Sequence, residues 1–164
     1  MGTRTGDLDI GVVSYIMDKE ELALSSMNTV FNKQSGMLGV SGVSSDMREI
    51  EDASWNKGDH RATLALKMYH YRVKKYIGAY AAALGGVDII IFAGGIGENG
   101  PETREHICEN MDYLGITIDP NKNDGLRSKE AIISADDKPV KVMVVPTNEE
   151  LVIAQDTLKI VEKM

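Results

Sequence analysis

The stretch VDIIIFAGGIGENGPE, residues 87–102, decides the fold. Residues 87–93 form an apolar run rich in β-branched side chains, too apolar for an exposed strand, and we predict a central strand of a parallel sheet there. Residues 94–100 follow as a glycine-rich turn. Pro101 at a first helical position, with Glu102 in the first turn, then predicts a helix. A strand, a glycine turn and a helix in succession are typical of α/β folds.

The residues that open the chain are mostly helical in pattern. Apolar residues at helical spacing predict short helices over residues 11–20, behind the capping residue Asp9, and over residues 26–32. Three glycines and three serines interrupt residues 36–45, where we predict a connecting loop.

Two further helices are predicted ahead of the glycine turn. Asp46, with Glu49 three residues later, resembles a capping pair that opens a helix ended by Gly58. The longest helix is predicted over residues 60–84 and is ended by Gly85. Apolar residues recur every three or four positions along it and form a face that we expect in the core: Leu66, Tyr69, Val73, Ile77, Tyr80 and Leu84.

The last third of the chain alternates strands and loops before a final helix. Strands are predicted over residues 116–118, 131–134 and 140–145. Thr147 and Glu150 fit a capping box that opens the final helix. The alternation of strands and helices predicts an α/β fold with parallel pairing, in which ligands gather at the carboxyl ends of the strands.

The composition excludes several classes of function. Eighteen Lys and Arg against 25 Asp and Glu give a formal net charge of −7, which disfavours non-specific binding to nucleic acid or to an anionic membrane. The apolar runs are far shorter than the roughly 20 residues of a membrane-spanning helix. The single cysteine, Cys108, excludes an internal disulfide and is expected to pack as a small hydrophobe. We therefore expect a cytoplasmic protein without nucleic-acid or membrane partners.

The glycine turn over residues 94–100 has two readings. Glycines let the backbone approach a ligand closely, and the turn could cradle part of a nucleotide. It lacks both the Gly-Lys-Ser/Thr of a P-loop and the GxGxxG spacing. The alternative is a tight turn that needs a positive φ and binds nothing.

Two charged residues outside this turn are further candidates. Arg4 lies in a polar, glycine-punctuated segment, where its guanidinium could hold a phosphoryl group or be solvated at a frayed terminus. Glu149 follows a predicted strand, where a carboxylate suits Mg²⁺ or is merely solvated.

Several separate segments together resemble one family. In the order of the chain they match the carboxyl-terminal part of the acetate kinase family, and the resemblance covers essentially all of residues 1–164. The resemblance implies a partial, ribonuclease-H-like, nucleotide-binding domain of the acetate and sugar kinase, actin and chaperone ATPase superfamily, with the amino-terminal domain absent. The matching segments are residues 2–9, 42–48, 71–80, 92–99 and 146–150.

The resemblance also implies the chemistry and the residues that perform it. Enzymes of the family transfer the γ-phosphoryl group of ATP to acetate, reversibly and in line, with Mg²⁺, and act as homodimers. Arg4 resembles the arginine that stabilises the transferring phosphoryl group, and Glu149 resembles the carboxylate associated with Mg²⁺. The residues implied to bind ATP or ADP are Asp46, Met47, Arg48, Gly95, Ile96, Gly97, Glu98 and Asn99.

Two other functions remain open at this stage. Propionate kinases share these motifs, and the acyl pocket that would distinguish them is absent from this sequence. The chain could also be a non-catalytic nucleotide-binding or dimerisation module. Because the acetate pocket and further catalytic groups belong to the absent half of the family pattern, we expect the isolated chain to be inactive.

Overall fold

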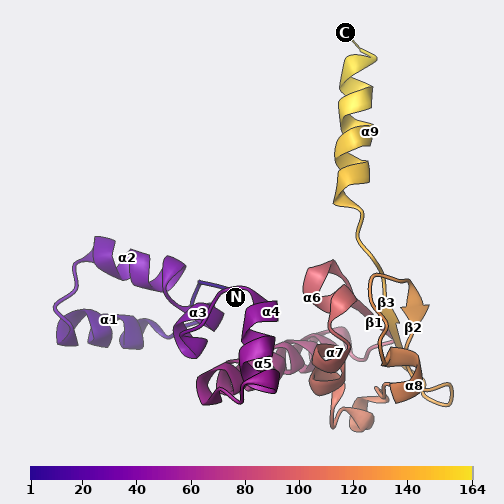
Figure 1. Ribbon diagram of the computed structural model, residues 1–164, viewed down its shortest axis with the longest axis horizontal. Coiled ribbons are helices and arrows are strands. Elements are labelled where there is room, and N and C mark those ends of the chain that lie inside the picture. The colour runs from indigo at the N-terminus through magenta and orange to yellow at the C-terminus, as the bar shows by residue number, and fades with distance from the viewer. Residues whose placement is uncertain (164) are drawn as a thin grey trace. The chain divides into compact units, whose positions relative to one another are not determined.

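The computed structural model describes residues 1–163, and Met164 lies outside the described residues. The chain divides into two compact units, Met1–Val73 and Lys74–Met164. Figure 1 shows the helices and strands of both units.

The first unit is helical. Its buried cluster brings together Met37, Met47, Ile50, Ala53, Ala62, Ala65 and Leu66. Burying these apolar side chains stabilises a unit whose helices over residues 10–51 are each too short to be stable alone. Its helices are α1 (Ile10–Lys19), α2 (Leu24–Lys33), α3 (Gly36–Ser41), α4 (Met47–Glu51), a π-helical turn (Asp52–Asn56) and the start of α5 (His60–Leu84).

Most predicted helices of this unit are confirmed, and one predicted loop is wrong. The Asp9 side chain caps α1 by accepting a hydrogen bond from the Gly11 N–H at 2.7 Å. Residues 36–41, predicted as loop, form α3. Gly36 (φ +61°) begins this helix and Gly42 (φ +68°) ends it. The glycines therefore mark the ends of a short helix and do not prevent it.

The longest helix, α5, has the predicted bounds but not the predicted buried face throughout. Leu66 is buried, whereas Tyr80 and Leu84 are exposed. Towards its end α5 buries Ala81 instead. The face of α5 that carries the large apolar residues is therefore not the buried face near the end of the helix. The predicted core face is wrong at Tyr80 and Leu84.

The second unit contains a three-stranded sheet with the order β1-β3-β2. β1 (Ile89–Phe92) pairs in parallel with β3 (Lys141–Val144), with Phe92 opposite Val144. β2 (Ala131–Ile132) is antiparallel to β3, and the strand predicted over residues 116–118 is reduced to one bridge between Ile118 and Ser134. The remaining elements are α6 (Gly94–Asn99), α7 (Pro101–Cys108), a 3₁₀ turn (Asp112–Leu114), α8 (Pro120–Asn123) and α9 (Glu149–Val161).

The position of β1 in the sheet corrects one prediction. β1 is an edge strand among the described residues, not a central one, and Ile89 and Ile91 are 52% and 59% exposed. β3 is the central strand, with Val142 and Val144 buried. The apolar composition of β1 is typical of a strand that is buried on both faces. It does not show whether a second strand pairs with its outer edge.

None of the described helices combines the length and apolarity required to span a membrane.

We predict that Cys108 is unreactive in the folded chain. Its thiol is buried, and burial raises its pKa to about 12, so almost no thiolate exists near pH 8. A thiol-specific reagent at pH 8 is expected to leave the native chain unmodified and to label one thiol per chain in guanidinium chloride. Stoichiometric labelling under native conditions would show that Cys108 does not pack in the core as described.

Candidate functional site

The glycine segment follows the carboxyl end of β1 as the short helix α6, and its glycines have different structural requirements. Gly94 has φ +69°, a conformation that side chains rarely adopt. A Cβ on Gly97 would lie 3.1 Å from the carbonyl carbon of Phe92. Gly95 has no such requirement, because its φ is ordinary and a Cβ there meets nothing within 4 Å. The backbone at Gly95 is therefore open to a ligand.

Glu98 joins this segment to a distant part of the chain. Its side chain is 8% exposed, and Oε1 accepts hydrogen bonds from the Thr147 N–H at 2.8 Å, Thr147 Oγ1 at 2.9 Å and the Gly94 N–H at 2.9 Å. The bonds from Thr147, with that from Gly94, hold the pKa of the carboxyl below its usual range. The carboxylate therefore faces the protein.

The start of α9 corrects the predicted capping box. Thr147 Oγ1 donates to Glu98, and the cap is Asn148, whose Oδ1 accepts from the Leu151 N–H at 3.0 Å. Glu150 therefore does not pair with Thr147 as predicted. Glu149 is exposed and, in the described part of the chain, its side chain makes no hydrogen bond or ion pair.

Glu149 suits Mg²⁺ only with ligands from elsewhere. Within residues 1–163 no group of three His, Cys, Asp or Glu side chains could hold a metal ion alone. Mg²⁺ commonly uses one or two carboxylates together with waters and substrate phosphates. An exposed carboxylate without a protein partner fits that role.

Arg4 lies in a segment with a fixed backbone, which contradicts a frayed terminus. The Thr5 N–H donates to Phe31 O and the Ser35 N–H donates to Thr3 O, both at 2.9 Å. Gly36 passes so close that a Cβ on it would lie 2.7 Å from the Arg4 carbonyl oxygen. The guanidinium of Arg4 is exposed and, among the described residues, has no hydrogen bond or ion pair. The backbone of Arg4 is thus fixed, and its guanidinium is accessible to a ligand.

The segment from Asp46 to Arg48 pairs its own charges. Asp46 caps α4 by accepting from the Arg48 N–H at 2.9 Å, and the Arg48 guanidinium donates to the same carboxylate at 3.1 and 2.6 Å. These side-chain bonds lower the pKa of Asp46 and raise that of Arg48. Only the Asp46 half of the predicted capping pair forms, because the Asp46 N–H donates to Ser44 Oγ at 3.0 Å and not to the Glu49 carboxylate.

Met47 separates these two charged residues and anchors them. Its side chain is buried in the cluster of the first unit, while Arg48 is exposed. A Cβ on Gly2 would lie 3.4 Å from the Ser45 carbonyl oxygen, so the amino-terminal segment lies beside this one. The first unit thus brings together the segments of Arg4 and Asp46, and the second unit brings together Glu98 and Thr147.

Arg104 is a residue of this region that sequence reasoning missed. It is completely buried, and its guanidinium donates to Gly97 O at 2.7 Å, Glu98 O at 3.1 Å, Leu126 O at 2.8 Å and Asn123 Oδ1 at 2.9 Å. Burial lowers its pKa. An arginine inside a helix is usually solvent-exposed, so its pattern gave no signal. Its bonds fix the carboxyl end of α6.

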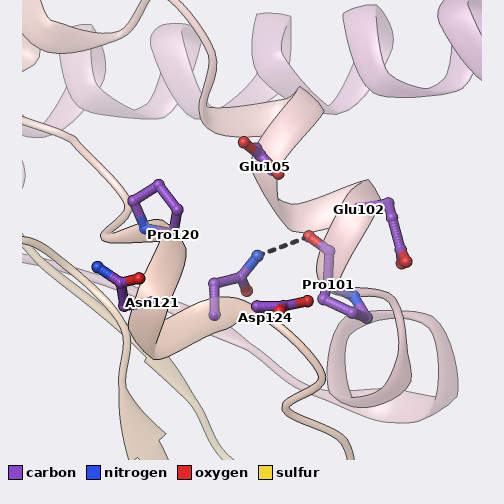
Figure 2. Close-up of a pocket in the computed structure, with 7 residues that line it drawn as sticks. Pro101, Glu102, Glu105, Pro120, Asn121 and Asp124 are labelled. Atoms are coloured by element: carbon purple, nitrogen blue, oxygen red, sulfur yellow. Dashed lines mark hydrogen bonds between the residues drawn. The ribbon is translucent and has the colours of Figure 1, made fainter.

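A cavity of about 250 Å³ lies elsewhere in the second unit, between α7 and α8. Figure 2 shows the carboxylates of Glu102, Glu105 and Asp124 around it, beside Pro101 and Pro120. None of the residues predicted to bind nucleotide or metal lines this cavity. We therefore do not assign it to the candidate site.

Comparisons with known proteins agree on one family. The model of the acetokinase family matches residues 1–155. The acetate kinase of Bacteroides thetaiotaomicron is 59% identical over 163 residues, which are 99% of this chain and 41% of that protein. The acetate kinase of Porphyromonas gingivalis is 56% identical over 162 residues, which are 99% of this chain and 40% of that protein.

Solved structures give the same result. The crystal structure of the Porphyromonas gingivalis acetate kinase superposes with a TM-score of 0.90 at 55% identity, covering 98% of this chain and 40% of that one. A propionate kinase from Francisella tularensis superposes with a TM-score of 0.84 at 39% identity, covering 94% of this chain and 39% of that one. The chain spans about 40% of the length of the curated relatives it matches. Since the family model covers nearly all of its residues, this chain belongs to the acetokinase family.

Proposed function

We propose that residues 1–164 form the carboxyl-terminal, nucleotide-binding part of an acetate kinase. The complete enzyme transfers the γ-phosphoryl group of ATP to acetate and yields acetyl phosphate and ADP. The observation that carries the proposal is the connection between the open backbone at Gly95 and the segment of Glu149, made through Glu98 and Thr147 at the carboxyl ends of two parallel strands. Ligands of α/β sheets bind at such an edge.

Each candidate residue has a role in this proposal. Two segments bind ATP or ADP: one contributes Asp46, Met47 and Arg48, and the other contributes Gly95, Ile96, Gly97, Glu98 and Asn99. The buried side chain of Met47 assigns it an anchoring role, with Asp46 and Arg48 presented at the surface. The open backbone at Gly95 permits close approach of the nucleotide.

The charged residues act on the phosphoryl group. A loose phosphoryl-transfer transition state spreads negative charge over the equatorial oxygens, and catalysis depends on positioning and on cations. The guanidinium of Arg4 donates hydrogen bonds to these oxygens through its planar fork. Glu149 would hold Mg²⁺, which neutralises charge on the phosphates when bound.

The proposal includes a homodimer located in the cytoplasm. Exposed apolar side chains on α9, among them Ile153 and Ile160, and on the edge strand β1 support burial against further protein. A sedimentation measurement on the complete enzyme tests the dimer, and a purely monomeric enzyme at high concentration would contradict it.

Propionate is the second candidate substrate, because a propionate kinase superposes on nearly the whole chain. Acetate is preferred since the two bacterial acetate kinases described above are more similar to this chain, at 59% and 56% identity against 39% for the propionate kinase. Steady-state kinetics with both acids, on the complete enzyme that carries this chain, test the preference.

The variants below are tested in a chimeric kinase. In this protein the 164-residue chain replaces the matching 40% of the Porphyromonas gingivalis acetate kinase, to which it is 56% identical. The acyl pocket then comes from a protein named as an acetate kinase, and each variant reports on this chain alone.

Substitution of Gly95 by valine is expected to weaken nucleotide binding selectively. A branched side chain at this open position blocks the approach of the nucleotide to the backbone, so the Michaelis constant for ATP should rise about tenfold or more, and that for acetate should change little. Gly78→Val is the matched control, because Gly78 is also helical and open, and its effect measures the helix cost alone. Equal ATP affinity of Gly95→Val and its parent in a direct titration would contradict the assignment.

Substitution of Glu149 by alanine is expected to raise the Mg²⁺ concentration required for half-maximal activity by about tenfold, as befits the loss of one charged ligand. Glu150→Ala is the control, because Glu150 is the adjacent exposed carboxylate of α9. Titration of activity with Mg²⁺ at saturating ATP makes the comparison. A shift in Glu150→Ala without one in Glu149→Ala would reverse the assignment.

A further inference from the structure

The Glu98 carboxylate extends the pairing of β1 and β3 beyond the ends of the strands. The last paired residues are Phe92 and Val144, and the Val145 N–H still donates to Phe92 O at 2.9 Å. No further backbone bond continues this ladder in the described residues. Instead, the Thr147 N–H and hydroxyl donate to the side chain of Glu98, 49 residues earlier in the sequence.

The Glu98 carboxylate also binds the start of α6. We call its hydrogen bonds to Thr147 and Gly94 the Glu98 bridge. Glu98 lies one helical turn after Gly94, so its side chain reaches back to the Gly94 N–H. Arg104 holds the carbonyl oxygen of the same residue from the opposite end of α6. Glu98 is thereby fixed at its backbone and at its side chain, with Oε1 shared by three donors.

The donors to Glu98 are neutral, which distinguishes it from a structural ion pair. In the described part of the chain, no Lys, Arg or His forms a salt bridge with its carboxylate. Hydrogen bonds that involve a charged acceptor are stronger than neutral ones. A carboxylate used in this way makes a strong connection between two main-chain segments without placing a cation beside the site.

We propose that Glu98 is a positioning residue that holds the nucleotide segment at Gly95 and the metal carboxylate Glu149 in a fixed relation through Thr147. The inference rests on the proposed function and alters one part of it, because Glu98 then acts on the protein and does not contact the nucleotide. Glu149 follows Thr147 by two residues, so release of Thr147 frees the chain that carries it.

The consequence is coupling between two binding events. Glu149 would hold Mg²⁺ beside the nucleotide phosphates, so binding of the nucleotide with its metal would require both segments at once. If the bridge is broken, each segment must be ordered during binding, and the affinity for nucleotide and the apparent affinity for metal fall together. Acetate, bound by other parts of the enzyme, is unaffected.

Four variants separate the parts of the bridge. Glu98→Ala removes the acceptor, and Glu98→Gln keeps an acceptor oxygen without its charge. Thr147→Val removes one of the three bonds, and Thr147→Ser restores the hydroxyl. Glu105→Gln is the control, because it neutralises an exposed carboxylate on the neighbouring helix α7.

The first measurement needs neither nucleotide nor metal. Amide hydrogen exchange of the 164-residue chain is expected to be about tenfold or more faster at Gly94 and Thr147 in Glu98→Ala than in the parent, and unchanged in Glu105→Gln. Unchanged exchange at both amides in Glu98→Ala would overturn the bridge itself.

The second measurement uses the chimeric kinase at a temperature at which all variants are folded. Glu98→Ala should raise both the Michaelis constant for ATP and the half-saturating Mg²⁺ concentration by about tenfold, and leave the constant for acetate within twofold. Thr147→Val should act in the same direction, Glu98→Gln should be intermediate, and Thr147→Ser should resemble the parent. Glu149→Ala should have a smaller effect on the Mg²⁺ requirement in the Glu98→Ala background.

The outcomes distinguish the inference from the function on which it rests. A higher constant for ATP in Glu98→Ala, with amide exchange at Gly94 and Thr147 unchanged, would mean that Glu98 contacts the nucleotide directly and would overturn the positioning role. Faster exchange without any change in ATP or Mg²⁺ dependence would also overturn it. Failure of the unsubstituted chimeric kinase to bind ATP would instead refute the proposed function, whatever the exchange rates show.

Discussion

Substitution of Arg4 by alanine is expected to lower kcat of the chimeric kinase by about 100-fold or more, with small changes in the Michaelis constants. In the proposed function the guanidinium meets charge that develops on the phosphoryl oxygens, and loss of one preorganised donor typically costs roughly 2.7 to 4 kcal/mol of transition-state stabilisation. The fixed backbone of residues 3–5 supports this preorganisation. Steady-state kinetics with ATP and acetate measure the effect.

Two controls define this result. Arg4→Lys should recover only part of the activity, because an ammonium offers a point charge in place of a planar fork. Lys33→Ala removes another exposed cation from the same unit and should leave kcat near that of the parent. A kcat of Arg4→Ala within a few-fold of the parent would remove Arg4 from the chemical step.

The 164-residue chain by itself is expected to show no acetate-dependent release of ADP. It corresponds to about 40% of its relatives, and joint positioning of two reactants supplies roughly 7 to 11 kcal/mol of the barrier reduction in favourable cases. A coupled assay of ADP release with the pure chain measures this, with the chimeric kinase as positive control. Acetate-dependent turnover by the chain alone would contradict the assignment of the acetate site to other parts of the enzyme.

The sequence predicted helix and strand boundaries well where they depend on residues close together in the chain. Asp9 and Asp46 cap the helices that the sequence assigned to them, and Pro101 begins α7. The β-branched run before the glycines forms β1. These features depend on neighbours within a few residues, and such information is present in the sequence.

Features that depend on distant partners were not predicted. Thr147 was expected to cap α9, but the carboxylate of Glu98, 49 residues away, takes its hydroxyl and Asn148 caps the helix instead. Arg104 was not singled out because nothing local indicates that its guanidinium is buried among carbonyl oxygens. β1 is apolar enough for a central strand but lies at an edge, since the sheet order is a property of the whole fold.

The candidate site itself was found from the resemblance more than from the local pattern. The glycines alone left a nucleotide cradle and a tight turn equally open. Gly94 requires glycine because of its positive φ, and Gly97 requires it because a Cβ would lie too close to Phe92. Neither requirement applies to Gly95. Within residues 94–100, Gly95 is therefore the glycine for which the described structure shows no folding requirement, as the proposed close approach of a nucleotide needs.

The most direct test of the central claim is acetate-dependent ADP release by the chimeric kinase. If this chain is the nucleotide-binding part of an acetate kinase, the chimeric kinase should turn over with a kcat within about tenfold of the Porphyromonas gingivalis enzyme, because the two segments are 56% identical over 162 residues. A folded chimeric kinase that neither binds ATP nor releases ADP in the presence of acetate and Mg²⁺ would contradict the claim.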